Sequence, residues 1–352
     1  MIKVLIVEDS RVKQELLTYV LKSDPAIDVV GVVDDGINAL QAVKEKHPDV
    51  ITMDIHMPQM GGFEATRLIM ENEPRPIVIV SASTGAKDVA STFQAFEAGA
   101  LAVVLTPPGF GHPDHEAAAR ELVQTVKLMS EIKVVRRFSH TVKPLPSVKT
   151  VVRNIKEAGE FQMIAIGTST GGPPVLNKLL SLLPADLPVP LLIVQHITPG
   201  FTEGFVNWLS GTSGFPVHIA IHGQQPLPGH GYVAPDNFHM GIVSGFRIAL
   251  NDHAPEYGVR PSAAYLFHTV AQVLGPHAIG VLLTGMGKDG ARELLEMKNA
   301  GALTIVQDEA SSIVFGMPGE AVKLGAAEYI LPPEAIAAML VSLLKTTSGK
   351  RG

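Results

Sequence analysis

The chain contains two separate series in which short runs of β-branched and aliphatic residues alternate with amphipathic segments. The first series fills the first third of the chain, and the second begins after Phe161. This alternation is typical of βαβ units, which build parallel sheets with helices on both faces. A length of 352 residues also exceeds what one hydrophobic core usually organises. The sequence therefore predicts two doubly wound α/β domains, a five-stranded parallel domain followed by a mostly parallel, Rossmann-like domain.

The alternation stops at residues 131–160, where proline, lysine and arginine replace the apolar periodicity. We interpret this segment as a linker between a first domain of residues 1–130 and a second of residues 161–346. Within the second domain, residues 229–251 contain short strand-like runs separated by Pro235-Asp236-Asn237 and Ser244-Gly245. This pattern predicts an antiparallel hairpin inserted in the second sheet.

Composition narrows the classes of partner. The chain has no cysteine, which excludes disulfides and thiolate metal sites. Its net charge of -6 argues against nucleic acid, because nucleic-acid-binding proteins carry a basic face. No secretory pattern follows Met1, and no apolar run approaches the length of a membrane span. We expect a cytoplasmic monomer without membrane insertion.

Acidic and hydroxyl side chains follow the predicted strands of the first domain. Glu8 and Asp9 follow the first strand, Asp54 the third, Ser81 ends the fourth, and Thr106 follows the fifth. Because the carboxyl ends of parallel strands meet at one edge, these side chains are expected to converge. Three carboxylates repel one another unless a hard cation such as Mg²⁺ joins them. The sequence therefore predicts a magnesium site able to bind a phosphoryl group.

Three motifs of this region resemble the receiver domain of response regulators. They are Val7-Glu8-Asp9-Ser10, Met53-Asp54-Ile55-His56-Met57-Pro58 and Gly61-Gly62. The resemblance implies that Asp54 accepts a phosphoryl group and that Glu8, Asp9 and Asp54 hold Mg²⁺. It also implies that Ser81 and Thr106 sense the phosphoryl oxygens.

Two positions depart from the receiver pattern. Receivers carry a lysine where this chain has Thr106, and many carry an aromatic residue where it has Val103. Threonine can donate one hydrogen bond, but a charge-assisted bond to a phosphoryl oxygen is about twice as strong. We therefore expect this receiver to be phosphorylated poorly or to signal poorly.

The second domain opens with a candidate nucleophile. Gly167-Thr168-Ser169-Thr170-Gly171 matches G-x-S-x-G, in which a sharp strand-to-helix turn exposes the serine hydroxyl. An anion-binding helix N-terminus capped by Ser169 is the alternative for this motif alone. His196 follows a second apolar strand, and Asp289 lies in the loop after a third. Together they predict a triad: Ser169 as nucleophile, His196 as general base and Asp289 as its orienting partner.

Four segments resemble the chemotaxis protein-glutamate methylesterases. They are Gly167-Thr168-Ser169-Thr170-Gly171-Gly172, Val194-Gln195-His196, Leu283-Thr284-Gly285-Met286-Gly287-Lys288-Asp289-Gly290 and Phe315-Gly316-Met317-Pro318-Gly319-Glu320. The resemblance implies hydrolysis of glutamyl methyl esters and deamidation of glutamines on methyl-accepting chemoreceptors. It further implies a chemotaxis histidine kinase as phosphodonor, and an oxyanion hole at the Met286 backbone N–H near Thr170.

Two other functions compete with this interpretation. Gly285, Gly287 and Gly290 form G-x-G-x-x-G after a strand, with Asp308 downstream, the pattern of a dinucleotide-binding oxidoreductase. That pattern leaves Ser169 and His196 without a role. The second alternative is a regulator that binds receptors without catalysis, and the complete trio of side chains argues against it.

Overall fold

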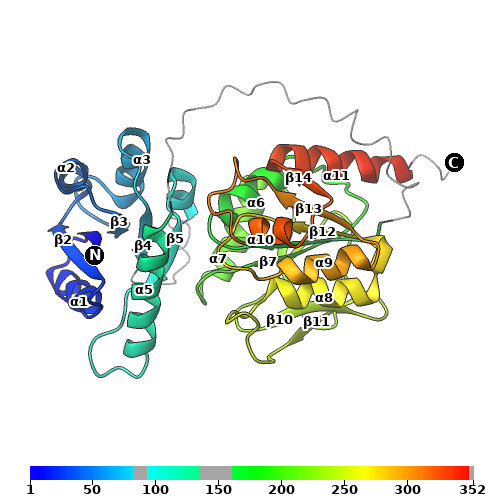
Figure 1. Ribbon diagram of the computed structural model, residues 1–352, viewed down its shortest axis with the longest axis horizontal. Helices are drawn as coiled ribbons and strands as arrows, with labels where there is room; N and C mark the ends of the chain where they lie inside the picture. Colours follow the sequence, from blue (N-terminus) through cyan, green and yellow to red (C-terminus); the bar gives the residue numbers. More distant parts are fainter. Residues whose placement is uncertain (82–92, 133, 135–160, 349–352) are drawn as a thin grey trace. The chain divides into compact units, whose positions relative to one another are not determined.

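The computed structural model describes residues 1–81, 93–132, 134 and 161–348. The chain divides into two compact units, Met1–Thr141 and Val142–Gly352 (Figure 1). The predicted linker, residues 131–160, lies almost entirely outside the described residues, so the predicted domain limits remain predictions. Within the described part of the chain, no helix combines the length and apolar character needed to cross a membrane.

The first unit contains a five-stranded parallel sheet in the order β2-β1-β3-β4-β5, as predicted. Its strands are β1 (Ile2–Val7), β2 (Ile27–Val33), β3 (Val50–Met53), β4 (Ile77–Ser81) and β5 (Ala102–Leu105). Four helices of this unit form two pairs, α1 with α5 and α2 with α3. They are α1 (Arg11–Lys22), α2 (Gly36–Lys46), α3 (Gly62–Asn72) and α5 (His115–Ser130). Consecutive residues of β3 and β4 are all buried, which shows that both faces of the sheet are covered.

The second unit contains a seven-stranded parallel sheet in the order β14-β13-β12-β6-β7-β9-β8. Its strands are β6 (Met163–Thr168), β7 (Leu191–Gln195), β8 (Val217–Ile219), β9 (Gly231–Val233), β12 (Ala278–Leu282), β13 (Leu303–Gln307) and β14 (Tyr329–Leu331). The three central strands, β12, β6 and β7, are buried along their whole length. This sheet is the doubly wound second domain that the sequence predicts.

Helices cover both faces of this sheet (Figure 1). Helix α6 packs against α7 and α11, and α9 packs against α8 and α10. Their bounds are α6 (Gly172–Ser181), α7 (Thr202–Ser213), α8 (Ala263–Val273), α9 (Ala291–Asn299), α10 (Met317–Lys323) and α11 (Pro333–Ser348), with a 3-10 turn at Gly275–His277.

The predicted hairpin exists, but not as an insertion in the main sheet. Strands β10 (His239–Val243) and β11 (Arg247–Asn251) pair antiparallel as a separate two-stranded sheet packed against α8. The preceding run, β9, instead joins the main sheet in parallel between β7 and β8. Buried side chains such as Met240, Ile242 and Ile248 belong to the core that α8 shares, which explains why the hairpin lies on the helix.

Candidate functional sites

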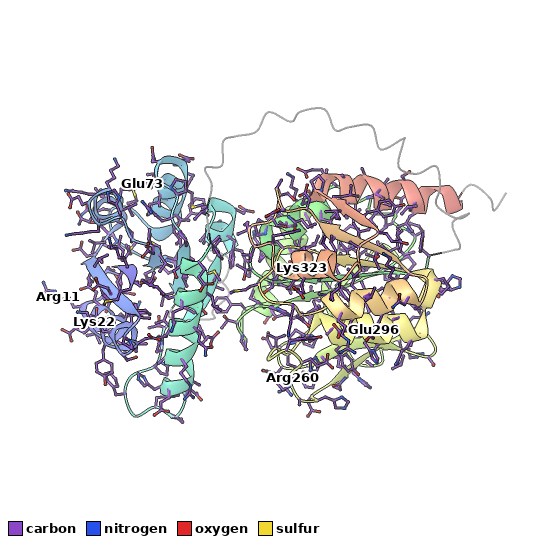
Figure 2. The ribbon with its side chains drawn as sticks, viewed as in Figure 1. Arg11, Lys22, Glu73, Arg260, Glu296 and Lys323 are labelled. Atoms are coloured by element: carbon purple, nitrogen blue, oxygen red, sulfur yellow. The ribbon has the colours of Figure 1, made fainter. Side chains whose placement is uncertain are left out.

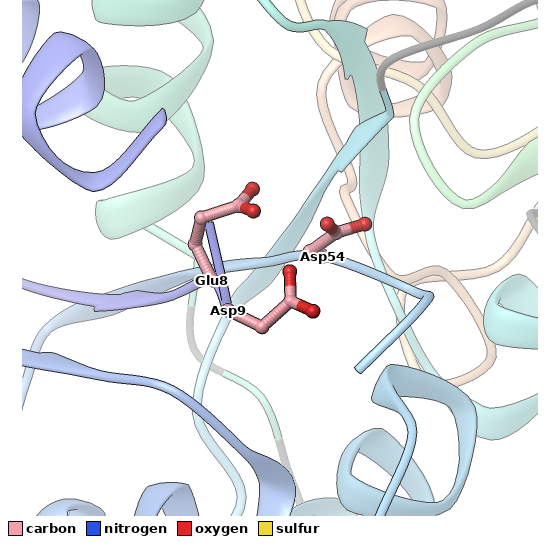
Figure 3. Close-up of side chains that lie close together, drawn as sticks. All are labelled: Glu8, Asp9 and Asp54. Carbon is pink, nitrogen blue, oxygen red and sulfur yellow. The ribbon is translucent and has the colours of Figure 1, made fainter. Parts of the chain in front are cut away.

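The first site lies at the carboxyl ends of β1 and β3. One carboxylate oxygen from each of Glu8, Asp9 and Asp54 lies within 4.8 Å of the others (Figure 3). Glu8 and Asp54 are buried and Asp9 is exposed. Burial, followed by the charge of Asp54, raises the pKa of Glu8 to about 7. Glu8 Oε2 is buried without a hydrogen-bond partner among the described residues, so the site fits a hard, oxygen-seeking cation such as Mg²⁺.

The two oxygens of Asp54 have different surroundings. Oδ1 accepts hydrogen bonds from the backbone N–H groups of Ile55 at 2.6 Å and His56 at 3.3 Å. Oδ2 accepts one from Lys13 Nζ at 3.1 Å, and the same ammonium lies 3.3 Å from Glu8 Oε1. Oδ1 thus bonds to the backbone, and Oδ2 is the oxygen that faces the Lys13 ammonium. The sequence motifs did not single out Lys13.

Ser81 and Thr106 lie at the same edge of the sheet as Asp54. Ser81 pairs with Leu105 in the β4–β5 ladder, and the Thr106 backbone N–H donates to the Ser81 carbonyl at 2.8 Å. Thr106 Oγ1 is buried and has no hydrogen-bond partner among the described residues. Both residues therefore stand where a phosphoryl sensor is expected, and that role remains a prediction.

The second site joins the loops after β6, β7 and β12. His196 Nε2 lies 2.8 Å from Asp289 Oδ2, although the two residues are 93 positions apart in the chain. Asp289 Oδ1 also accepts from Ser262 Oγ at 2.7 Å and from the Ala264 N–H at 3.0 Å, and Oδ2 accepts from the Ala263 N–H at 2.7 Å. The carboxylate thus sits at the N-terminus of α8, where backbone N–H groups favour negative charge.

These donors decide the charge state of Asp289. Its carboxylate is buried, and burial alone acts to raise the pKa. The hydrogen bonds from His196, Ser262 and Ala263 outweigh burial and hold the pKa below its ordinary value. Asp289 is therefore an anion at neutral pH, as a partner for a histidine base must be.

The sheet register brings Ser169 beside His196. Thr168 and Gln195 are paired at the ends of β6 and β7, and Ser169 and His196 are the first residues after the two strands. Neighbouring strands lie about 4.8 Å apart, so the serine and the histidine leave the sheet side by side. The His196 N–H extends this register by donating to the Thr168 carbonyl at 3.1 Å. All three predicted triad residues therefore meet at one edge, with Ser169 and His196 half-buried and Asp289 buried.

The turn after Ser169 has the predicted strand-turn-helix form. Gly171 adopts φ 77°, a left-handed conformation that suits glycine, and α6 begins at the next residue. The Ser169 N–H donates to the Thr284 carbonyl at 3.0 Å, which ties the turn to the loop after β12. The serine is thus fixed by the backbones of two neighbouring strands.

The loop after β12 forms the wall beside the serine. Thr284 Oγ1 donates to the Thr170 carbonyl at 3.0 Å. A methyl group on Gly285 would lie only 2.8 Å from Ser169 Cβ, so the loop backbone touches the serine directly. Met286 is the next residue, and both it and Thr170 are half-buried. The positions predicted for the oxyanion hole therefore lie in the two segments that flank Ser169.

Gln195 is a second residue that the motifs did not assign. Its side chain is 3% exposed, and its Nε2 donates to the backbone carbonyls of Ser169 at 2.9 Å and His196 at 2.7 Å. A methyl group on Gly172 would meet Gln195 Oε1 at 2.1 Å, so the glycine makes room for this amide. The sequence signal for Gln195 is a polar residue at the end of an otherwise apolar strand.

Arg260 has a structural role in this region (Figure 2). Its guanidinium donates to the backbone carbonyls of Asp252 and His253, so it fastens the segment that leads into α8. These contacts account for Arg260 without a substrate.

A receiver-type sheet with an acidic strand-end site, followed by a sheet that joins a serine, a histidine and an aspartate, defines a response regulator whose effector is a serine hydrolase. Residues 4–109 match the response regulator receiver domain family and residues 164–340 match the CheB methylesterase family. The chain belongs to the CheB methylesterase family, in the form that carries a receiver domain.

Similar full-length proteins have the same two-domain span. The chain is 53% identical over 345 residues to the protein-glutamate methylesterase/protein-glutamine glutaminase of Nitrosospira multiformis, covering 98% of this chain and 97% of that protein. It is 52% identical to protein-glutamate methylesterase/protein-glutamine glutaminase 1 of Syntrophus aciditrophicus, covering 97% and 98%. The CheB methylesterase catalytic domain of Thermotoga maritima aligns with a TM-score of 0.51 and 34% identity, covering 53% of this chain and 100% of that domain.

These relationships exclude the dinucleotide-binding alternative. Gly285, Gly287 and Gly290 lie within residues matched by the methylesterase family. Asp308, the expected ribose-binding acid, instead accepts from the Ser311 N–H at 3.1 Å and from the Ser311 hydroxyl. The glycine pattern belongs to the loop that contains Asp289 and packs beside Ser169.

Proposed function

We propose that this chain hydrolyses glutamyl methyl esters, and deamidates glutamines, on methyl-accepting chemoreceptors, with Ser169, His196 and Asp289 as its catalytic triad. The observation that carries the proposal is the 2.8 Å contact between His196 and Asp289, next to Ser169 in the strand register. The relatives named above are protein-glutamate methylesterases and protein-glutamine glutaminases. The enzyme would therefore act in the cytoplasm, on the cytoplasmic part of these receptors.

The contact with Asp289 determines which histidine nitrogen acts as the base. Asp289 accepts a hydrogen bond from the Nε2–H of His196, so the neutral imidazole carries its free lone pair on Nδ1. Nδ1 takes the proton of Ser169 as its Oγ attacks the ester carbonyl. The protonated imidazole then gives this proton to the leaving methoxide, and methanol departs. Water, deprotonated by the same nitrogen, hydrolyses the acyl-enzyme to the glutamate carboxylate and free Ser169.

The loop beside Ser169 stabilises the tetrahedral intermediate. Negative charge develops on the former carbonyl oxygen, and backbone N–H groups fixed in advance stabilise it. The Met286 N–H, with Thr170 nearby, is the proposed donor, and the close approach of Gly285 to Ser169 supports it. For a glutamine substrate the same steps release ammonia in place of methanol.

The first domain regulates the second through Asp54. A chemotaxis histidine kinase is the proposed phosphodonor, and Asp54 Oδ2 is the proposed acceptor because the backbone holds Oδ1. Glu8, Asp9 and Asp54 would hold Mg²⁺, which when bound offsets the negative charge of the carboxylates and the incoming phosphoryl group. Ser81 and Thr106 are the proposed partners of the phosphoryl oxygens.

Methanol release from a methylated chemoreceptor cytoplasmic fragment tests the proposal. We expect Ser169→Ala to lower the rate by about 10³-fold or more, because no other oxygen replaces the nucleophile. Ser181→Ala, an exposed serine on α6, is the matched control and should behave as wild type. Receptor pull-down with Ser169→Ala separates the two remaining interpretations. Unchanged hydrolysis in Ser169→Ala would refute the triad, and an inactive wild type that binds receptor would support the non-catalytic regulator.

A further inference from the structure

The phosphorylation site lacks the lysine that receivers carry at the position of Thr106. Thr106 offers a hydroxyl without charge, and its Oγ1 makes no hydrogen bond among the described residues. The acidic site nevertheless has a cation. Among the described residues, Lys13 is the basic side chain that forms ion pairs with Glu8 and Asp54.

The turn between β1 and α1 aims Lys13 at this site. The Ser10 N–H donates to Glu8 Oε1 at 3.1 Å, and Gln14 Nε2 donates to the Glu8 carbonyl at 2.6 Å. These bonds fix the start of α1 over the end of β1. Lys13, in the first turn of the helix, then reaches Asp54 Oδ2 at 3.1 Å, while its neighbour Val12 points to solvent.

The contact joins Lys13 to the oxygen of Asp54 that the backbone leaves available. Oδ1 accepts two backbone N–H groups, and Oδ2 accepts the Lys13 ammonium. The Lys13 side chain is 28% exposed, so its four-carbon chain has room to move. An ammonium already at Oδ2 can follow that oxygen when a phosphoryl group is attached to it.

We propose that Lys13 replaces the missing lysine of the receiver and donates a charge-assisted hydrogen bond to the phosphoryl group on Asp54. This inference rests on the proposed regulation through Asp54. In the reaction Asp54 Oδ2 forms a bond to phosphorus while the bond from phosphorus to the donor breaks, a P–N bond for a phosphohistidine of the kinase or a P–O bond for acetyl phosphate. The electron pair of that bond leaves with the donor. Lys13 remains protonated throughout and stabilises charge on the transferred oxygens. On this inference Thr106 does not by itself impair the site.

Labelling of Asp54 in the full-length chain by acetyl phosphate and Mg²⁺, followed by intact mass, tests the proposal. We expect Lys13→Met to slow labelling about tenfold or more, because a charge-assisted bond to the phosphoryl group is lost. Lys13→Arg should retain most of the rate. Lys22→Met, which removes an exposed lysine from the same helix (Figure 2), is the matched control.

A second variant tests whether the charge itself is what matters. Lys13→Met combined with Thr106→Lys returns a cation to the site from β5 instead of α1. We expect this double variant to recover labelling that Lys13→Met loses. Recovery also shows that the loss did not come from misfolding, because the double variant retains the Lys13→Met change.

Mg²⁺ binding without phosphodonor, measured by calorimetry, provides an independent measurement. Removing a cation from beside the carboxylates should leave Mg²⁺ affinity equal or higher in Lys13→Met. The inference would be overturned if Lys13→Met were labelled as fast as wild type or faster. It would also be overturned if the slower labelling were explained by weaker Mg²⁺ binding. In both cases the proposed regulation through Asp54 would still stand. A wild-type chain in which Asp54 is never labelled would overturn both.

Discussion

The side-chain amide of Gln195 donates a hydrogen bond of 2.9 Å to the backbone carbonyl of Ser169. Through its second N–H it donates to the carbonyl of His196 at 2.7 Å. One buried amide therefore joins the backbones of the proposed nucleophile and base, in addition to the strand ladder. Gln195 touches no reacting atom in this arrangement, so it acts as a positioning residue.

Replacement of Gln195 tests this role. Gln195→Met keeps the length of the side chain and leaves two carbonyls without their donor, and we expect kcat to fall about 10- to 100-fold with KM nearly unchanged. The free energy of unfolding should fall by about 1–3 kcal/mol. Steady-state methanol release and denaturant unfolding measure both effects. Gln162→Met, at an exposed position before β6, is the control, and equal kcat values in the two variants would contradict the positioning role.

The lowered pKa of Asp289 predicts how stability depends on pH. The folded state binds this proton less readily than the unfolded chain, so Asp289 stabilises the fold fully above its ordinary pKa of 3.8. This stabilisation is lost as the pH falls below 3.8 and through the lower pKa that Asp289 has in the folded state. Asp289→Asn should therefore be less stable than wild type at pH 7, and the difference should shrink in acid.

Trp208 makes this measurement specific to the second unit. It is the single tryptophan of the chain and lies buried on α7, so its fluorescence follows unfolding of that unit. Asp186→Asn, at an exposed loop position, is the control and should parallel wild type at every pH. A stability difference for Asp289→Asn that stays constant from pH 7 to strong acid would show that its charge does not contribute.

Gly285 lies so close to Ser169 that we expect a methyl group at position 285 to be destabilising. An added Cβ would lie 2.4 Å from Met317 Sδ and 2.8 Å from Ser169 Cβ. We expect Gly285→Ala to lower the free energy of unfolding by about 1–3 kcal/mol and to reduce methanol release, because the serine must shift. Gly211→Ala is the matched control, since a methyl group there meets nothing within 4 Å. An active, stable Gly285→Ala would contradict the close packing.

Removal of residues 1–160 tests control by the receiver. If the receiver limits access of the substrate to Ser169 in the unphosphorylated chain, residues 161–352 alone should release methanol faster. The increase is about tenfold if about one full-length molecule in ten is accessible to substrate. The Thermotoga maritima catalytic domain, which aligns over its full length with 53% of this chain, supports the choice of fragment. The full-length chain with Asp54→Asn, measured with and without acetyl phosphate, is the control. An equal rate for fragment and full-length chain would argue against inhibition by the receiver.

The alternation in the sequence predicts best those parts of the fold that have short, mostly aliphatic strands. β3, β7 and β13 are fully buried and mostly aliphatic, and each is followed directly by a polar residue, Asp54, His196 or Asp308, that marks its end. Helix α7 is not predicted from the sequence. Its residues, TEGFVNWLSGTS, include two glycines and four hydroxyl residues, which obscure the helical period. The prediction that residues 229–251 form a hairpin is wrong for β9, because its three residues, Gly231–Val233, carry too little pattern to show that they pair with β7 and β8.

Some residues of the two sites can be predicted from the sequence and others cannot. Residues at strand ends, such as Ser169, His196 and Asp54, could be named because parallel sheets gather strand ends at one edge. Lys13 could not, since its role depends on where a helix turn points after folding. Gln195 also lies at a strand end, but the structure alone shows that its amide bonds to the backbones of Ser169 and His196. Ser262, which donates to Asp289, likewise becomes visible only when α8 is placed beside the loop after β12.

The pairing of Thr168 with Gln195 fixes the backbones of Ser169 and His196 relative to one another, through a ladder in the interior of the second unit. A phosphoryl signal that moved these two backbones apart would have to break the ladder itself. A switch that leaves the ladder intact would instead change how many molecules are active at a given moment, with the same turnover for each active molecule.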